Sequence, residues 1–436
     1  MHEVTFHDLS HDGQGVCKVD GLTVFVPEGL KGEVATIEIV KHHKTFAQGR
    51  LVEVLQASPY RKDPPCPYFS QCGGCQLMHA HYETQLDFKR HRTQETLKRL
   101  GNITLDVDET LKMTHPFHYR HKAVVYFRRY ESTIQAGFFA KESHQIVDIK
   151  QCMVSHKHIF KVVQAVRAWA HDHASTVYDE TRSSGTLHGL KIRVSKETQT
   201  VMVTLLRVPG NGFKKDSLVQ HLTHECPFVE SIYEKIQAQP YGNPDADQSQ
   251  WLWGSKTIEE TLNGARYTLS PDAFFQINPS QMEALITTLI HQNFLKPTDH
   301  LLDAYCGVGA FAYGLKDHVA HVTGIDTSSA AIAQAQAQAS PSMQFRVGKA
   351  EAALKQGFDV VLMDPPRKGA SKTFLNALME HKIERVIYVS CNVSTLARDL
   401  NILQGGGYRV QFVQPIDMFP QTAHVESIVL LSLKTA

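Results

Sequence analysis

The stretch HLLDAYCGVGAFAYGL, residues 300–315, indicates how the second half of this chain folds. An apolar run leads into Gly307-x-Gly309, and a helical pattern follows at once. Glycines at such a turn let the backbone approach a ligand closely at the carboxyl edge of a parallel sheet. Asp326 ends the next apolar run, where a carboxylate reaches ribose hydroxyls in nucleoside-binding α/β folds.

A bare G-x-G motif is also compatible with a tight strand–helix turn that binds nothing. A dinucleotide usually needs a third glycine for its pyrophosphate, and this position holds Ala312. S-adenosylmethionine has no phosphate and makes no such demand. The run FDVVLMDPPRKG, residues 358–369, favours it, because two prolines fix a rigid strand exit beside Asp364, as in many methyltransferases that act on nucleobases.

From about Gly264 onward, near-continuous apolar runs alternate with helical segments, which predicts a parallel, doubly wound sheet. The last two apolar runs, residues 408–416 and 426–433, are joined without room for a helix. They predict an antiparallel hairpin at the edge of that sheet.

The first 58 residues read as short strands separated by glycine turns, which predicts a small β-barrel. Residues 82–100 carry a helical period, and strands are expected between residues 119 and 149. A chain of 436 residues is too long for one ordinary core. We therefore expect three domains: a barrel over residues 1–58, a central α+β domain over 59–262 and a Rossmann-like α/β domain over 263–436.

The composition is that of a folded protein with no overall electrostatic pull toward nucleic acid. Basic residues number 45 and acidic residues 44, so any RNA binding must use local basic patches. No apolar run approaches the roughly 18 residues that a membrane span needs. The N-terminus lacks the pattern of a signal peptide, and we expect a cytoplasmic protein.

Three cysteines gather in PCPYFSQCGGCQL, residues 65–77, and a fourth, Cys152, lies far downstream. Cys66, Cys72 and Cys75 have the spacing C-x5-C-x2-C, with glycines that let the loop wrap tightly. A redox pair in CGGC is one alternative, and thiols without a joint role are another. We expect metal ligation, for which the spacing leaves zinc and an iron–sulfur cluster open.

A lone thiol, Cys391, ends the apolar run in RVIYVSCNVSTLARDL, residues 385–400. Active sites of open α/β folds collect at such strand ends. The helix that follows is expected to lower the pKa of the thiol and so to favour a nucleophile. Glu426 begins the last strand, where desolvation would raise its pKa and suit it to act as a general base. A packed cysteine and an edge-strand charge are the structural alternatives.

Basic and aromatic residues alternate in YRHKAVVYFRRY, residues 119–130, as they do where strands bind single-stranded nucleic acid. The candidate contacts are Arg120, Lys122, Arg128 and Arg129, divided between the two faces of a strand. A second patch, FKRHR at residues 88–92, is equally compatible with a solvated helix face.

Together these motifs resemble the RNA (uracil-5)-methyltransferase family, in particular the branch with a TRAM barrel and an iron–sulfur cluster that modifies 23S ribosomal RNA. The resemblance extends from about DGQGV to the C-terminus and includes SPDAFFQIN, LLDAYCGVGAF, DPPRKG, YVSCNVSTLARDL and DMFPQTAHVESIVLL. It implies a [4Fe–4S] cluster on Cys66, Cys72, Cys75 and Cys152, S-adenosylmethionine contacts at Gln276, Tyr305, Asp326 and Asp364, Cys391 as nucleophile and Glu426 as base.

The chain departs from the family pattern at three positions without losing a reacting group. Val393 stands where proline is usual, Asp326 replaces the more frequent glutamate, and Ala310 replaces a polar residue of some members. The expected product is 5-methyluridine in 23S ribosomal RNA, formed by a monomer through a covalent bond from the cysteine to C6. Transfer RNA is the alternative substrate. A non-catalytic RNA-binding protein and an iron–sulfur redox enzyme are the competing classes.

Overall fold

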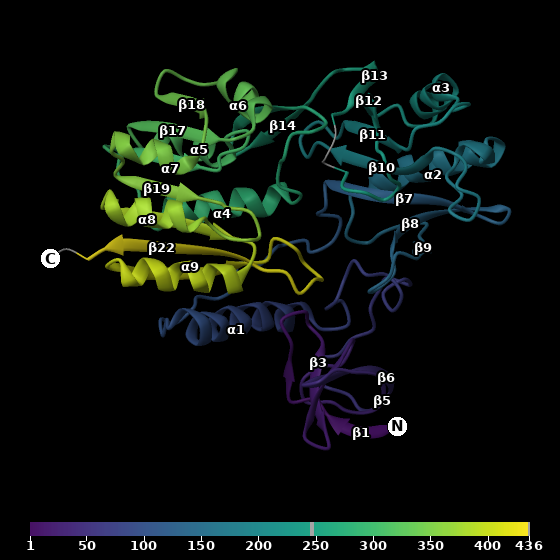
Figure 1. Ribbon diagram of the computed structural model, residues 1–436, viewed down its shortest axis with the longest axis horizontal. Helices are drawn as coiled ribbons and strands as arrows, with labels where there is room; N and C mark the ends of the chain where they lie inside the picture. The colour runs from purple at the N-terminus through teal and green to yellow at the C-terminus, as the bar shows by residue number, and fades with distance from the viewer. Residues whose placement is uncertain (245–247, 435–436) are drawn as a thin grey trace.

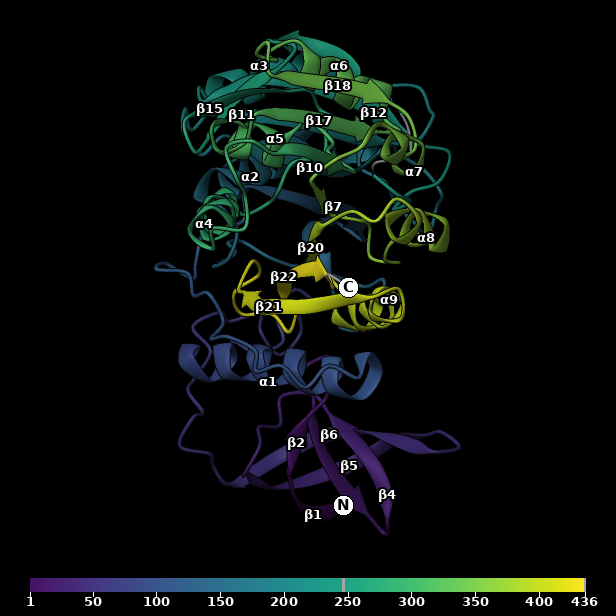
Figure 2. The same cartoon turned by 90° about the vertical axis from the view of Figure 1, so that its left-hand side faces the viewer.

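The computed structural model describes residues 1–244 and 248–434, which form a small N-terminal barrel beside two larger sheet-and-helix units. In Figures 1 and 2 the barrel lies at one end, and helix α1 (Tyr82–Gly101) separates it from the C-terminal sheet. The last two residues of the expected third domain, 435–436, are outside the described range.

The N-terminal sheet has the strand order β1-β5-β6-β4-β3-β2 and curls around a core that includes Phe6, Val24 and Ile37. Gly29 has no side chain because Phe6 fills the space: a Cβ atom there would lie 2.6 Å from the ring. The strands are β1 (His2–Thr5), β2 (Asp8–Leu9), β3 (Gly15–Val19), β4 (Leu22–Val26), β5 (Val34–His42) and β6 (Phe46–Gln56).

The central sheet has the order β13-β12-β11-β10-β7-β8-β9, and helices α2 and α3 pack on one of its faces. Alternation decides which residues meet the helices: Val125 and Phe127 of β7 point into that core. The elements are β7 (Lys122–Tyr130), β8 (Thr133–Phe139), β9 (Ile146–Asp148), α2 (Lys157–Asp172), β10 (Leu187–Val194), β11 (Val201–Arg207), α3 (Lys215–Glu225), β12 (Val229–Ile236) and β13 (Gln250–Gly254).

The C-terminal sheet has the order β18-β17-β16-β19-β20-β22-β21. Its first five strands are parallel, which confirms the predicted doubly wound sheet. The elements are α4 (Pro279–His291), β16 (His300–Ala304), α5 (Ala310–Leu315), β17 (His321–Asp326), α6 (Ser329–Gln336), β18 (Met343–Val347), α7 (Ala350–Ala353), β19 (Val360–Met363), α8 (Lys372–Glu380), β20 (Arg385–Ser390), α9 (Val393–Gly405), β21 (Tyr408–Ile416) and β22 (Glu426–Leu433).

The predicted terminal hairpin is also present, since β21 and β22 pair antiparallel. Strand β22 lies inside the sheet, between β20 and β21, and β21 forms the edge. Helices α4, α5 and α6 share a core on one face of the sheet, whereas α7, α8 and α9 pack on the other face.

A hairpin at the expected domain boundary and a helix from the expected central segment pack against the C-terminal sheet. Strands β14 (Ile258–Leu262) and β15 (Ala265–Leu269) form a hairpin, so the expected boundary at residues 262/263 falls between its two strands. Helix α1 (Tyr82–Gly101), which confirms the predicted helical segment, packs on α9 and contributes Leu97 to the same core (Figure 2).

Within the described residues, no helix combines the length and the apolar character that crossing a membrane requires.

Candidate active site

Four of the predicted site residues lie together at one edge of the C-terminal sheet. The strand order β16-β19-β20-β22 places Tyr305, Asp364 and Cys391, each just past the end of a parallel strand, side by side. The antiparallel register pairs Ser390 with Ser427, so Glu426 lies across from Cys391. Residues separated by up to 121 positions in sequence thus meet at the edge where ligands bind in open α/β sheets.

The turn that carries Cys391 is fastened to the loop that follows Asp364. Asn392 caps α9, and its side chain accepts a hydrogen bond from Ser394 N at 3.1 Å. The same side chain donates from Nδ2 to the carbonyl of Arg367 at 3.1 Å, and Thr395 Oγ1 donates to that carbonyl at 3.2 Å. The backbone of the exposed residue Arg367 is therefore held beside the turn that carries the thiol.

The environment of Cys391 raises the pKa of the thiol to about 11. Burial is the largest cause, and the carboxylates of Glu426 and Asp364 raise the pKa further, while Arg367 lowers it. The prediction that the helix N-terminus leaves this thiol with a lowered pKa is therefore wrong. The sequence shows the helix start but not the two carboxylates, which come from other strands.

The neighbouring carboxyl groups are themselves hard to ionise. Burial raises the pKa of Glu426 well above its usual range, and the charge of Asp364 adds to the effect, whereas Arg367 lowers it. The predicted direction for Glu426 is thus confirmed. Burial likewise raises the pKa of Asp364 to about 7.

Asp303 is a further acidic residue at this edge that was not predicted from the sequence. It is fully buried near the end of β16, and burial raises its pKa to about 8, with Asp364 and Asp326 adding to the shift. Its Oδ2 accepts a hydrogen bond from Ala312 N at 3.0 Å, and its Oδ1 has no hydrogen-bond partner among the described residues. The sequence does contain a signal for this residue, since Asp303 is an acidic residue inside the otherwise apolar run LLDAYC.

The glycine turn after β16 leaves open space beside the backbone. Gly307 has a φ of +55°, and a Cβ atom built on it would meet nothing within 4 Å. Its N–H donates to Asp326 Oδ2 at 3.0 Å, while Asp326 Oδ1 accepts from Ser328 N at 2.8 Å. Gly309 and Tyr305 also have positive φ values, +84° and +64°. The turn thus joins the ends of β16 and β17 around a backbone that a ligand can approach.

Gln276 lies in the loop between β15 and α4 and is half-buried. Two residues of the central domain bind the backbone of this loop. Arg193 Nη2 donates to the carbonyl of Ala273, and His121 N donates to the carbonyl of Ile277.

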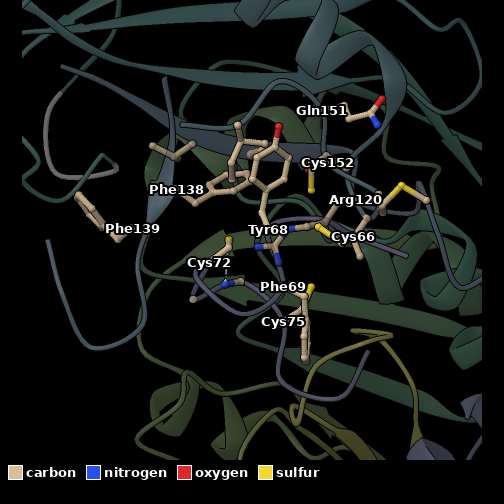
Figure 3. A pocket seen from close by; sticks show the side chains of 18 of the residues that line it. Cys66, Tyr68, Phe69, Cys72, Cys75, Arg120, Phe138, Phe139, Gln151 and Cys152 are labelled. Atoms are coloured by element: carbon tan, nitrogen blue, oxygen red, sulfur yellow. Dashed lines mark hydrogen bonds between the residues drawn. The ribbon is translucent and has the colours of Figure 1, made fainter. Parts of the chain in front are cut away.

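The four predicted cysteine ligands line one cavity of about 580 Å³ in the central domain (Figure 3). Figure 3 shows the sulfur atoms of Cys66, Cys72, Cys75 and Cys152 facing a common space, with Arg120 beside them. The cysteine loop is attached to the strand β8 region: Cys72 forms a β-bridge with Ala140, and Gly73 N donates to Phe139 O at 3.0 Å. Cys152 follows β9 on the other side of the cavity.

The thiols influence one another electrostatically. Burial raises the pKa of Cys75, and the charges of Cys152, Cys72 and Cys66 raise it further. Across residues 1–244 and 248–434, however, no three His, Cys, Asp or Glu side chains are grouped so that they could hold a metal ion.

The candidate RNA contacts occupy different positions around β7. Lys122 and Arg128 alternate onto the face of the strand away from α2, while Arg129 is on the other face. Arg128 Nη2 donates to Gln135 Oε1 at 2.9 Å, and its guanidinium lies 5.3 Å from the centre of the Tyr130 ring. Arg120 precedes the strand and lines the cysteine cavity.

The second basic patch, residues 88–92, is neither an exposed RNA-binding surface nor a solvated helix face as a whole. Lys89 is fully buried in an ion pair with Asp417. Arg90 Nε donates to Val107 O at 2.8 Å, and Arg92 Nη1 donates to Ala423 O. These cations fasten α1 to other segments of the protein.

Three family models match parts of the chain. Residues 343–434 match the family described as tRNA (uracil-5-)-methyltransferase, residues 2–52 match the TRAM domain, and residues 301–378 match a methyltransferase domain.

Similar proteins match over nearly their whole length. The chain is 38% identical to an RNA methyltransferase of Halalkalibacterium halodurans, covering 99% of this chain and 97% of that protein. It is 37% identical to an RNA methyltransferase of Listeria innocua, with the same coverage of 99% and 97%. The crystal structure of the Pyrococcus abyssi tRNA (uracil-54, C5)-methyltransferase in complex with S-adenosyl-L-homocysteine superimposes with a TM-score of 0.80 at 27% identity, covering 98% of this chain and 99% of that chain.

Proposed function

The chain belongs to the RNA (uracil-5-)-methyltransferase family, whose members depend on S-adenosylmethionine, and on that premise we propose that it methylates C5 of a uridine through a covalent bond from Cys391 to C6. The observation that carries the proposal is the β20–β22 register, which brings a thiol and a buried carboxyl group face to face at the carboxyl edge of the sheet.

In the proposed reaction Cys391 supplies the nucleophile. Its thiolate adds to C6 of the uracil ring, which turns the inert C5 into a carbon with carbanion character. S-adenosylmethionine, when bound, supplies the electrophilic methyl group. Glu426 then removes the proton from C5, and Cys391 leaves C6 with the electrons of its bond, restoring the ring double bond.

The residues at the glycine turn fit a nucleoside-containing cofactor. The open space at Gly307, the Asp326 carboxylate fixed between two backbone amides and the acidic edge at Asp364 offer contacts to uncharged hydroxyls and to a positively charged sulfonium. We assign Gln276, Tyr305, Gly307, Gly309, Asp326 and Asp364 to this role. A target base must leave its stack to reach this edge, so an accessible loop is the expected substrate.

We further propose that Cys66, Cys72, Cys75 and Cys152 hold a [4Fe–4S] cluster. A single zinc ion needs its ligands at about 2.3 Å from one point. Four thiols that line one cavity of about 580 Å³ supply the four thiolates that a [4Fe–4S] cluster takes, in a space larger than a single ion fills. The cluster would join the loop after residue 65 to the segment after β9.

The proposed substrate is 23S ribosomal RNA, bound by a monomer. We assign the contacts to the barrel of residues 1–58 and to Arg120, Lys122, Arg128 and Arg129 of the central segment, residues 59–262, with the chemistry in residues 263–436. Transfer RNA is the second candidate, because the Pyrococcus abyssi protein of similar structure is a tRNA (uracil-54, C5)-methyltransferase.

The test is to map 5-methyluridine in total RNA from cells with and without the protein. Loss of the modification from 23S ribosomal RNA alone supports the first candidate, and loss from transfer RNA alone supports the second. Purified Cys391→Ala protein should bind the same RNA but transfer no methyl group and form no adduct with 5-fluorouridine RNA. Full activity of that variant would contradict the nucleophile assignment.

A further inference from the structure

We propose that Gln421 and Gln85 are positioning residues for Glu426, because they lock the loop of residues 417–425 that delivers this side chain to the substrate. The inference rests on the proposed role of Glu426 as the base. It concerns the second half of the reaction, in which the covalent intermediate is resolved.

Residues 417–425, which we call the base loop, connect β21 to β22 and are held by segments that are distant in sequence. Tyr119 Oη donates to the carbonyl of Pro420 at 2.9 Å, and Asn278 Nδ2 donates to that of Met418 at 3.0 Å. Helix α1 contributes Lys89, which donates to Phe419 O at 3.1 Å. The base loop is therefore fixed by contacts that the C-terminal sheet itself does not provide.

Gln421 is the most highly connected residue of the base loop. Its backbone N–H donates to Gln85 Oε1 at 3.0 Å, and Gln85 Nε2 donates to Gln421 Oε1 at 3.0 Å. The Gln421 carbonyl accepts from the amides of Gln76 and Leu77 at 3.1 and 3.0 Å. Its side-chain Nε2 donates to Pro116 O at 3.3 Å. Gln421 thus contacts three separate segments through its own backbone and side-chain amides.

The backbone of Gln421 has a φ of +69°, which side-chain-bearing residues rarely adopt. A strained conformation persists when the surroundings over-determine it, and such residues cluster at functional sites. Gln421 is fully buried and Gln85 is 1% exposed, so water cannot replace the bonds between them. The contact between Gln85 and Gln421 therefore fixes the base loop from inside the protein and not at its surface.

The Gln85–Gln421 contact constrains Glu426 only through the residues that precede it in the chain. The ladder between β21 and β22 fixes Glu426 through its register with Ile416, which leaves the preceding residues to the base loop. Ala423 N donates to Gln76 Oε1 at 3.4 Å, and Ala423 O accepts from Arg92. If the Gln85–Gln421 contact is removed, Glu426, the first residue of β22, keeps its strand pairing but loses the fixed segment that precedes it.

A displaced Glu426 impairs one step and spares the earlier ones. Addition of Cys391 to C6 and transfer of the methyl group to C5 do not need the base. Resolution does: the C5–H bond breaks, its proton goes to Glu426, its electrons form the C5–C6 double bond, and the C6–S bond breaks to return the thiolate. Loss of positioning should therefore leave the enzyme covalently bound to methylated RNA.

The experiment compares Gln85→Ala and Gln421→Gly with wild type, using the full chain, uridine-containing RNA and methyl-labelled S-adenosylmethionine. Glycine at position 421 keeps the positive φ while removing the side chain. Both variants should lose turnover by about 10- to 100-fold, the effect of a misplacement near 1 Å, with the KM for RNA within about twofold of wild type. The labelled, denaturation-resistant protein–RNA adduct should accumulate.

Gln94→Ala is the matched control, since Gln94 is on the same helix but bonds to Leu105 O at 2.9 Å and Val107 N at 2.8 Å. This variant should lose comparable stability without accumulating adduct. Glu426→Gln sets the benchmark for a missing base. If Glu426→Gln traps the adduct and neither glutamine variant does, the positioning role is excluded. If Glu426→Gln itself traps none while wild type methylates, the base assignment fails.

Discussion

At the scale of single residues, Cys391 lies between opposing charges. The carboxylates of Glu426 and Asp364 raise the pKa of the thiol, and Arg367 lowers it. Asn392 and Thr395 both donate to the Arg367 carbonyl, so the backbone that carries this cation is held beside the turn of the thiol. Arg367 is the charged side chain that lowers the pKa of Cys391.

We therefore predict that Arg367→Ala slows formation of the covalent adduct about three- to tenfold near neutral pH. In wild type the adduct rate should rise with pH, by up to about tenfold per unit, because the thiolate fraction of a group with a pKa of about 11 rises in that way. Ionisation of Asp364, whose pKa is about 7, should flatten the rise near neutrality by adding a repulsive charge.

Single-turnover trapping with 5-fluorouridine RNA over a range of pH measures this effect. Arg346→Ala is a suitable control, since Arg346 lies on β18 and bonds to Gln344. Equal profiles for Arg367→Ala and wild type would contradict the electrostatic role.

The direction of the Cys391 shift shows where residue-level reasoning from sequence fails. A helix start after the thiol is visible in the sequence, and its effect on the pKa has a known sign. The opposing carboxylates come from β19 and β22, whose proximity depends on strand order. For Glu426 the local apolar run was enough, because burial alone raises the pKa of a carboxyl group.

At the scale of elements, α1 shows how a buried ion pair fixes a helix to a loop. Lys89 and Asp417 side chains are both fully buried, and Asp417 Oδ2 accepts a second bond from Tyr82 Oη at 2.7 Å. Gln281 Nε2 donates to the Asp417 carbonyl at 3.1 Å. Removing one charge would leave its partner without compensation in an apolar environment.

We predict that Lys89→Met lowers the free energy of unfolding by about 3–5 kcal/mol. The double variant Lys89→Met/Asp417→Leu should recover part of this loss, because no uncompensated charge remains. Urea denaturation of Lys89→Met, Asp417→Leu, the double variant and wild type checks the prediction. A double variant at least as unstable as the sum of the single changes would indicate that packing, not charge, determines the cost.

Element types were easier to predict from the sequence than element neighbours. The parallel strands, the terminal hairpin and the helix expected over residues 82–100 follow from periodicity and turn residues. The packing of α1 on α9 does not, and the short strand β18 and the β14–β15 hairpin were missed. The basic residues in FKRHR look like a surface patch in the sequence. In the structure Lys89 is buried, because it forms an ion pair with Asp417, which is distant in sequence.

At the scale of the whole molecule, the cysteine cavity is lined by two segments of the central domain that are distant in sequence. One of these segments also contacts the base loop. Gln76, which bonds to the base loop, directly follows Cys75. The proposed cluster would thus stabilise the anchor of a loop that belongs to another sheet.

We predict that protein purified without oxygen carries about four iron and four sulfide ions per chain. Cys152→Ala should lose most of this iron and its visible absorbance, because it removes the ligand from the second segment. Cys226→Ala, which alters a buried cysteine outside the 580 Å³ cavity, should keep both. About one zinc ion per chain and no sulfide would contradict the cluster assignment.

The position of β22 has a consequence for the order of events during synthesis. This strand lies inside the C-terminal sheet although every strand that it joins is translated before it. A nascent chain that stops before residue 426 would expose the apolar edge of β20, a hazard for association with other chains. The same chain would lack the carboxyl group at position 426, the proposed base, so closure of the sheet and the proposed ability to release a finished RNA would arrive in a single translational step.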